Sequence, residues 1–196
     1  MRAAALDHAL ALMTEEGAGA VTLSEVARRL GIRGPSLYKY FPSRNALYDA
    51  LFARGLAEEQ AAVLVALTGV PRGTPRIRAG AEAVVRWAVE NPALAQLLHW
   101  RPVPGFQPSP QTFQPSQQDM ATVQDEFAEA VRLGQLSPAA GGEAALRLYT
   151  VLLSGLISQQ LANEPGVPYS EGAFSRLTGA AMDQFLSAYR PTGAKK

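Results

Sequence analysis

Positively charged side chains gather in one short segment near the N-terminus. Five basic residues and no acidic residue occur between Val26 and Tyr48, whereas the chain from Leu56 onward is nearly balanced in charge. Ammonium and guanidinium groups bind phosphate oxygens, so this segment could hold a polyanion such as duplex DNA. A solvated basic face without a partner is the alternative interpretation. The basic residues of the segment are Arg28, Arg29, Arg33, Lys39 and Arg44.

The helix start and stop signals around these residues predict three helices. A first helix spans about residues 2–16 and ends at a glycine-rich turn. Thr22 begins a capping box, in which its hydroxyl and the Glu25 carboxylate satisfy free amides at the start of a second helix. Gly31 ends that helix, and Pro35 suits the first position of a very short third helix. One apolar face runs through the second and third helices: Leu23, Val26, Ala27, Leu30, Ile32, Leu37 and Phe41.

A capped helix, a four-residue turn with glycine and a short further helix form the arrangement of a helix-turn-helix, whose last helix enters the major groove of DNA. The polar side of residues 33–44 is free for that contact. We assign Arg33 and Ser36 to base edges and Pro35 to a thymine methyl group.

Three further side chains of this segment suit the phosphate backbone. Lys39, Tyr40 and Arg44 can position the domain without reading sequence, which makes affinity dependent on salt. Core packing is the alternative for Tyr38 and Tyr40, because both lie close to apolar neighbours in the sequence.

The stretch Val21–Ala27, followed by Gly31-Ile32 and by Ser36–Leu47, resembles the TetR family of bacterial regulators. The resemblance covers about residues 6–52 and implies a dimer on a palindromic operator, usually a repressor that a ligand of the C-terminal domain releases. Tyr40 stands where the family often has histidine, and Arg44 where lysine is usual. The candidate DNA contacts are Thr22, Arg33, Gly34, Pro35, Ser36, Tyr38, Lys39, Tyr40 and Arg44.

The remaining residues predict further helices at about 44–67, 75–90, 92–99, 116–134, 138–163 and 170–189. Between two of them, residues 101–115 contain five prolines and are predicted as a long loop, either a lid or binding loop or a flexible linker. We therefore expect an all-α fold of about nine helices. A helix-turn-helix domain (residues 1–48) would be joined by a long connector helix to a ligand-binding and dimerisation domain (residues 49–196).

The two C-terminal helices are apolar on more than one side, so each needs two packing partners. We predict that they pair with their copies in a four-helix interface, and burial within a monomeric core is the alternative. This region is also similar to the WHG-type subgroup of the family, with Ser154-Gly155 at the position of its His-Gly pair. The predicted interface residues are Leu146, Leu153, Leu156, Ile157, Gln160, Phe174, Leu177, Ala181 and Phe185.

Aromatic residues are concentrated between the connector and the interface helices, in a chain with only 8% aromatic residues. Pockets for small ligands are lined in this way, so we expect a small, largely apolar effector, with plain core packing as the alternative for each residue. The candidate ligand-binding residues are Trp87, Leu98, His99, Trp100, Phe106, Phe113, Phe127 and Tyr149.

Other classes of protein fit the sequence less well. The chain has no cysteine, and its two histidines, His8 and His99, are far apart, so we expect no catalysis, metal or cofactor. The N-terminus lacks the pattern of a signal peptide and no apolar run is long enough for a bilayer, which predicts a cytoplasmic protein without a membrane partner. The sequence thus favours a ligand-responsive, DNA-binding regulator, with a helical regulator acting through protein partners as the alternative.

Overall fold

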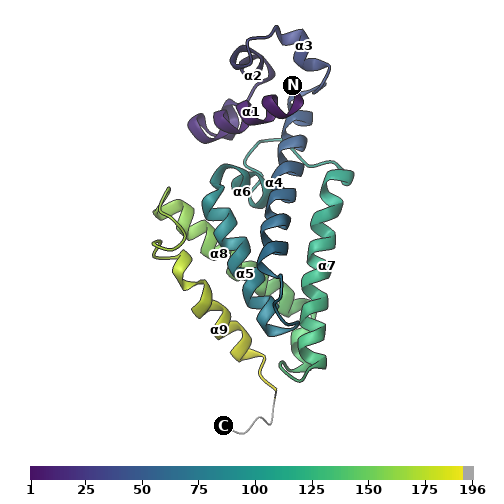
Figure 1. Ribbon diagram of the computed structural model, residues 1–196, viewed down its shortest axis with the longest axis vertical. Helices are drawn as coiled ribbons and strands as arrows, with labels where there is room; N and C mark the ends of the chain where they lie inside the picture. The colour runs from purple at the N-terminus through teal and green to yellow at the C-terminus, as the bar shows by residue number, and fades with distance from the viewer. Residues whose placement is uncertain (192–196) are drawn as a thin grey trace. The chain divides into compact units, whose positions relative to one another are not determined.

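The computed structural model describes residues 1–191, which form nine α-helices and three short 3-10 helices and contain no strand (Figure 1). The all-α prediction is therefore confirmed. Among the described residues, no helix is both long and apolar enough to cross a membrane. The α-helices are α1 Arg2–Glu16, α2 Leu23–Arg29, α3 Gly34–Tyr38, α4 Arg44–Ala66, α5 Thr74–Glu90, α6 Pro92–His99, α7 Pro110–Arg132, α8 Glu143–Asn163 and α9 Thr178–Ala188. The 3-10 helices are η1 Ala18–Ala20, η2 Pro138–Gly141 and η3 Ser175–Leu177.

The chain forms two compact units. Unit 1 comprises Met1–Glu58 and Asn91–Pro115, and unit 2 comprises Glu59–Glu90 and the residues from Ser116 onward. These units are defined by their internal contacts. The functional boundary expected between residues 48 and 49 stays a prediction.

The first six α-helices of the described chain begin within about one residue of the predicted positions, and the last three begin elsewhere. The segment predicted as a loop up to Pro115 is shorter, because α7 already begins at Pro110 and contains Pro115. The stretch predicted to start a helix at Ser137 instead forms η2 before α8 begins at Glu143. The last helix begins at Thr178, eight residues later than the predicted start at Ser170.

Unit 1 has one apolar core, to which α1, α2, α3, the first turns of α4, α6 and the segment after α6 all contribute. Leu37 is the buried residue of α3, and Leu12, Leu47 and Leu51 are fully buried in the neighbouring helices. Phe106, from the segment between α6 and α7, lies in the same core. The short α3 is therefore held by one buried anchor, which leaves its other side chains outside the core.

In unit 2, α5 lies against both α8 and α9, and Figure 1 shows α5 and α9 next to each other. The ring centroid of Phe127 on α7 lies 5.6 Å from that of Tyr149 on α8 and 5.7 Å from that of Phe185 on α9. Edge-to-face contacts at this separation are favourable beyond the area they bury. Phe127, Tyr149 and Phe185 are all buried, so these rings form an aromatic cluster inside unit 2.

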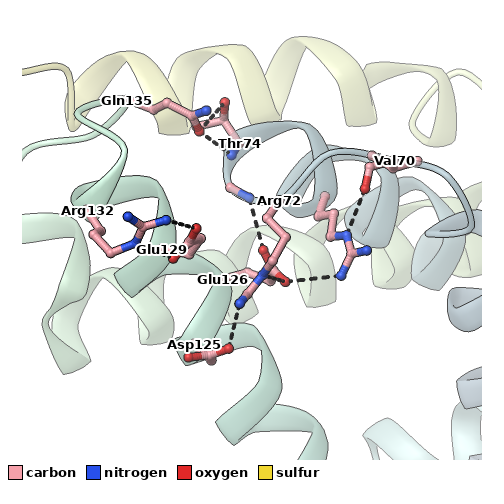
Figure 2. A network of polar contacts seen from close by, with 10 residues as sticks. Val70, Arg72, Thr74, Asp125, Glu126, Glu129, Arg132 and Gln135 are labelled. Atoms are coloured by element: carbon pink, nitrogen blue, oxygen red, sulfur yellow. Dashed lines mark hydrogen bonds and ion pairs between the residues drawn. The ribbon is translucent and has the colours of Figure 1, made fainter.

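The turn between α4 and α5 is tied to α7 by Glu126 (Figure 2). One carboxylate oxygen of Glu126 accepts a hydrogen bond from the Arg72 Nε at 2.9 Å, and the other accepts one from the Gly73 amide at 3.0 Å. Arg76 Nη1 lies 3.5 Å from the same carboxylate. Glu126 is only 8% exposed, so its charge needs these donors to remain buried.

Candidate nucleic-acid interface

Helix α2 is capped by one half of the predicted capping box. The Thr22 hydroxyl accepts a hydrogen bond from the Glu25 amide at 3.2 Å, as predicted. The Glu25 carboxylate does not return to the helix start. It accepts a hydrogen bond from Arg28 Nε at 2.8 Å and lies 3.4 Å from Arg29 Nε. These contacts, chiefly the hydrogen bonds from Arg28, lower the pKa of Glu25 to about 2.

Two of the five basic residues are neutralised by neighbouring carboxylates. Arg29 forms ion pairs with Glu15 at 2.7 Å and with Glu16 at 2.9 Å, which ties α2 to the end of α1. Arg28 is paired with Glu25. The positive field predicted for this segment is therefore narrower than the sequence indicates, and it falls on the residues after the turn.

The turn and α3 present a set of exposed side chains. Gly31 adopts a φ of 68°, a left-handed conformation that glycine tolerates without strain, and the chain then enters α3 with Pro35 in its first turn. Leu37 is fully buried. The exposed residues around it are Arg33, Pro35, Ser36, Tyr38, Lys39 and Tyr40.

The two tyrosines beside Leu37 are outside the core. Tyr38 is 54% exposed and Tyr40 is 44% exposed, so the alternative of core packing is wrong for both. A phenol combines an apolar ring with a polar hydroxyl, which suits contact with a sugar-phosphate backbone. Both residues therefore remain candidate DNA contacts.

Arg44, assigned from the sequence to a phosphate, makes contacts within the protein. Its Nε donates to the Val21 carbonyl at 2.8 Å, and its Nη2 donates to the Gly19 carbonyl at 2.6 Å. It begins α4, whose first turn is capped by the Ser43 hydroxyl, an acceptor for the Ala46 amide at 3.1 Å. Arg44 thus connects the start of α4 to the turn between α1 and α2.

Arg2 was not among the predicted contacts. Its guanidinium carbon lies 5.3 Å from the centroid of the Phe41 ring, within the range of a cation–π contact. Phe41 follows Tyr40, so this contact places a further exposed cation beside the end of α3. The sequence offered only a basic residue at position 2 as a signal for this contact.

The predicted ligand-binding residues divide between the two units. In unit 1, the Phe106 ring centroid lies 5.6 Å from that of Tyr48, and the His99 and Trp100 rings meet edge to face at 5.8 Å. Phe113 and Leu98 are partly buried against the same core. The members in unit 2 are buried residues: Trp87, Phe127 and Tyr149.

The predicted interface residues also divide, this time by burial within the protomer. The inward face of α8 includes Leu153, Ile157 and Gln160, and Phe185 is buried in α9. These four residues were predicted at the dimer interface, but their side chains are buried within the protomer. Gln160 is fully buried because its side chain accepts hydrogen bonds from the Phe174 and Ser175 amides. Leu146, Leu156, Phe174 and Ala181 are half-buried, and Leu177 is exposed.

An exposed apolar stripe occupies another side of α8. Val151 is 65% exposed, and Leu148 lies one turn before it. Gly155, one turn after Val151, is also exposed, and a Cβ there would meet no other atom within 4 Å. We define the α8 stripe as Leu148, Val151, Leu152, Gly155 and Leu156.

Two protein-family models match this chain, one over its N-terminal helices and one over most of the rest. Residues 5–51 match the family described as bacterial regulatory proteins, tetR family, and residues 77–182 match the tetracyclin repressor-like C-terminal domain. The chain belongs to the TetR family of transcriptional regulators, and α2 and α3 are its helix-turn-helix.

Individual relatives show how far the likeness extends. The chain is 33% identical over 100 residues to the HTH-type transcriptional regulator Rv1816 of Mycobacterium tuberculosis, a match that covers 50% of this chain and 43% of that protein. The chain therefore spans less than half the length of that relative. The regulator PfmR from Thermus thermophilus has a TM-score of 0.71 at 21% identity, covering 100% of this chain and 98% of that one. FadR from Bacillus subtilis, solved in complex with stearoyl-CoA, has a TM-score of 0.76 at 11% identity. The match covers 97% of this chain and 100% of that one.

Proposed function

We propose that the protein is a homodimeric, ligand-responsive repressor that binds a palindromic operator through the exposed side of α3. The observation that carries the proposal is the exposure of Arg33, Ser36 and Lys39 around the single buried anchor Leu37. Only a surface that remains open to solvent can be placed in a major groove. A basic, exposed helix at the end of a helix-turn-helix is better explained by DNA than by a protein partner.

Within this proposal the exposed residues have separate roles. Arg33 and Ser36 read base edges and Pro35 contacts a thymine methyl, because they lie at the start of α3 where the helix enters the groove. Lys39 and Tyr40, at the other end, contact phosphates. Further contacts in the proposed set are Thr22, Gly34 and Tyr38.

Replacing Lys39 with alanine is expected to lower the salt dependence of DNA binding. Each phosphate contact contributes about 0.9 to the slope of log affinity against log salt, so the variant should lose about that much. The measurement is a fluorescence titration of a random-sequence duplex at several salt concentrations. Arg147→Ala is the matched control, because Arg147 is an exposed cation of α8 paired only locally with Glu143.

Two results would count against the proposal. If the wild-type protein showed no salt-dependent binding to duplex DNA, a regulator that acts through protein partners would become the better explanation. If Lys39→Ala and Arg147→Ala lowered the slope equally, DNA would not be held on the α3 surface.

We also propose that two copies pair through the α8 stripe together with exposed parts of η3 and α9, where Leu177 is exposed. A single short recognition helix reads few base pairs, and a symmetric dimer doubles the site. The stripe supports this interface because it is apolar, exposed and interrupted by Gly155, which allows two helices to approach closely.

The proposed effector is a small, largely apolar molecule bound in unit 2 around Phe127 and Tyr149. Burial and the nearby Glu59 carboxylate raise the pKa of the Tyr149 phenol, and burial together with Glu59 also raises the pKa of Asp119. A few perturbed polar groups beside aromatic side chains are typical of a ligand site. FadR, which shares the fold, binds an acyl-CoA, and this supports an apolar ligand.

A panel of hydrophobic compounds that includes stearoyl-CoA should contain one that both raises the melting temperature and releases DNA. A ligand at 100 times its dissociation constant stabilises the folded state by about 2.7 kcal/mol. Differential scanning fluorimetry measures the shift, and the duplex titration measures release. A panel with no compound active in both assays would contradict the apolar effector.

A further inference from the structure

Tyr48 lies where three parts of unit 1 meet. Its side chain is fully buried in α4, and its hydroxyl donates a hydrogen bond to the Ala18 carbonyl in η1. The same hydroxyl accepts a hydrogen bond from Arg44 Nη2 at 2.9 Å, and this nitrogen also donates to the Gly19 carbonyl. Together with the bond from Arg44 to Val21, the pair fixes nearly the whole turn between α1 and α2.

The other side of the Tyr48 ring is supported by the segment between α6 and α7. Its centroid lies 5.6 Å from that of Phe106, which is itself buried and packs against Phe52 at 6.5 Å. The next residue of α4, Asp49, accepts hydrogen bonds from the Ser109 amide at 2.7 Å and from the Thr112 hydroxyl at 2.8 Å. The segment is therefore attached to the same turn of α4 that holds the α1–α2 turn.

We propose that Arg44 and Tyr48 are positioning residues for DNA binding: they hold the α1–α2 turn, and through it α2 and α3, in the orientation that fits the groove. Phe106 supports the Tyr48 ring from the α6–α7 segment. This inference rests on the proposed function. It assigns Arg44 to the turn instead of to a phosphate, and it adds Tyr48, which is buried and cannot touch DNA in this conformation.

The chemistry of Arg44 supports this assignment. Its planar guanidinium directs Nε and Nη2 to two different carbonyl groups, at 2.8 and 2.6 Å, and to the Tyr48 hydroxyl. A lysine ammonium has no such fork and cannot reach several acceptors in the same geometry. A lysine could replace a phosphate contact at this position, but it could not replace the connection to the turn.

The test compares DNA affinity in four variants: Tyr48→Phe, Arg44→Ala, Arg44→Lys and the double variant Arg44→Ala/Tyr48→Phe. The probe is the duplex that the wild-type protein selects from a random-sequence library, titrated at several salt concentrations. We expect Tyr48→Phe to weaken binding roughly two- to tenfold, the equivalent of one lost hydrogen bond, with an unchanged salt slope. Arg44→Lys should weaken binding as much as Arg44→Ala, and the double variant should lose less than the product of the two single losses.

Hydrogen exchange of the free protein gives a readout that does not need DNA. The amides of residues 17–33 should exchange faster in Tyr48→Phe, while those of α8 should be unchanged, which separates a local change in the turn from general unfolding.

The outcomes separate this inference from the proposed function. If the wild-type protein selects and binds a duplex but Tyr48→Phe binds it equally well, the positioning role is overturned. If Arg44→Lys restores binding and Arg44→Ala lowers the salt slope by about 0.9, Arg44 contacts a phosphate and its positioning role is overturned. If the wild-type protein selects no duplex, the proposed function itself fails.

Discussion

Replacing Val151 with glutamate is expected to convert the proposed dimer into a monomer and to weaken binding to the proposed operator at least about 100-fold. Val151 is 65% exposed at the centre of the α8 stripe, where it contributes little to the protomer's own core. An unpaired carboxylate buried between two copies of an apolar helix carries a penalty of several kcal/mol, and about 2.8 kcal/mol corresponds to 100-fold. Analytical ultracentrifugation gives the oligomeric state, and titration of the selected duplex gives the affinity.

The control for this variant is Thr150→Glu. Thr150 is also exposed and precedes Val151 directly, but the helix rotates about 100° per residue, so its side chain leaves α8 on a different side. Thr150→Glu should remain dimeric and bind the operator normally. If the Val151→Glu variant remained dimeric and bound the selected duplex with wild-type affinity, the dimer interface would lie on another surface.

Replacing Glu126 with alanine is expected to lower the free energy of unfolding by about 3 kcal/mol. The change leaves the Gly73 amide, which now donates to this carboxylate at 3.0 Å, without its acceptor, and it removes the partner of Arg72 Nε and Arg76. Loss of one member of a buried, hydrogen-bonded ion pair typically has an effect of this size. For a chain of this length, the melting temperature should fall by roughly 6 to 12 °C.

Glu143→Ala is the control for Glu126→Ala. Glu143 pairs with Arg147 on the same helix, and both side chains are 74% exposed. Such a pair is screened by solvent, so its removal should change stability by less than about 0.5 kcal/mol. Thermal and urea unfolding of both variants measure the difference, and equal losses would show that the network in Figure 2 does not hold the α4–α5 turn to α7.

The helix-turn-helix could be predicted from the sequence because its signals are local. The Thr22 cap and the turn at Gly31 depend on residues within a few positions of each other, and the structure places both as expected. The exposure of Arg33 and Lys39 followed from the position of the apolar residues. What the sequence did not show was the pairing of Arg29 with Glu15 and Glu16, residues of another helix.

The start of α7 was missed although Ser109-Pro110 is a local helix-start signal, and a contact with a distant residue adds to that signal. The Ser109 hydroxyl accepts from the Thr112 amide at 3.3 Å, and the serine is itself held by the Asp49 carboxylate, sixty residues earlier. A proline-rich sequence then continues as a helix, although Pro115 provides no amide for it. The five prolines of residues 101–115 favoured a loop and hid this cap.

The interface residues show a similar limit. Helix α8 is apolar on two sides, so the sequence alone cannot show which side meets α5 and which side is exposed. Only packing shows that Leu153 and Ile157 point inward while Leu148 and Val151 remain exposed. Gln160 was predicted as an interface residue, yet it is buried within the protomer, where its side chain accepts hydrogen bonds from the Phe174 and Ser175 amides.

Selection of bound duplexes from a random-sequence library tests the central claim most directly. A dimer that presents α3 twice should enrich a palindrome whose two halves are centred about one helical turn, or a multiple of it, apart. A library that yields no enriched sequence, or one without two-fold symmetry, would contradict a pair of α3 helices reading DNA.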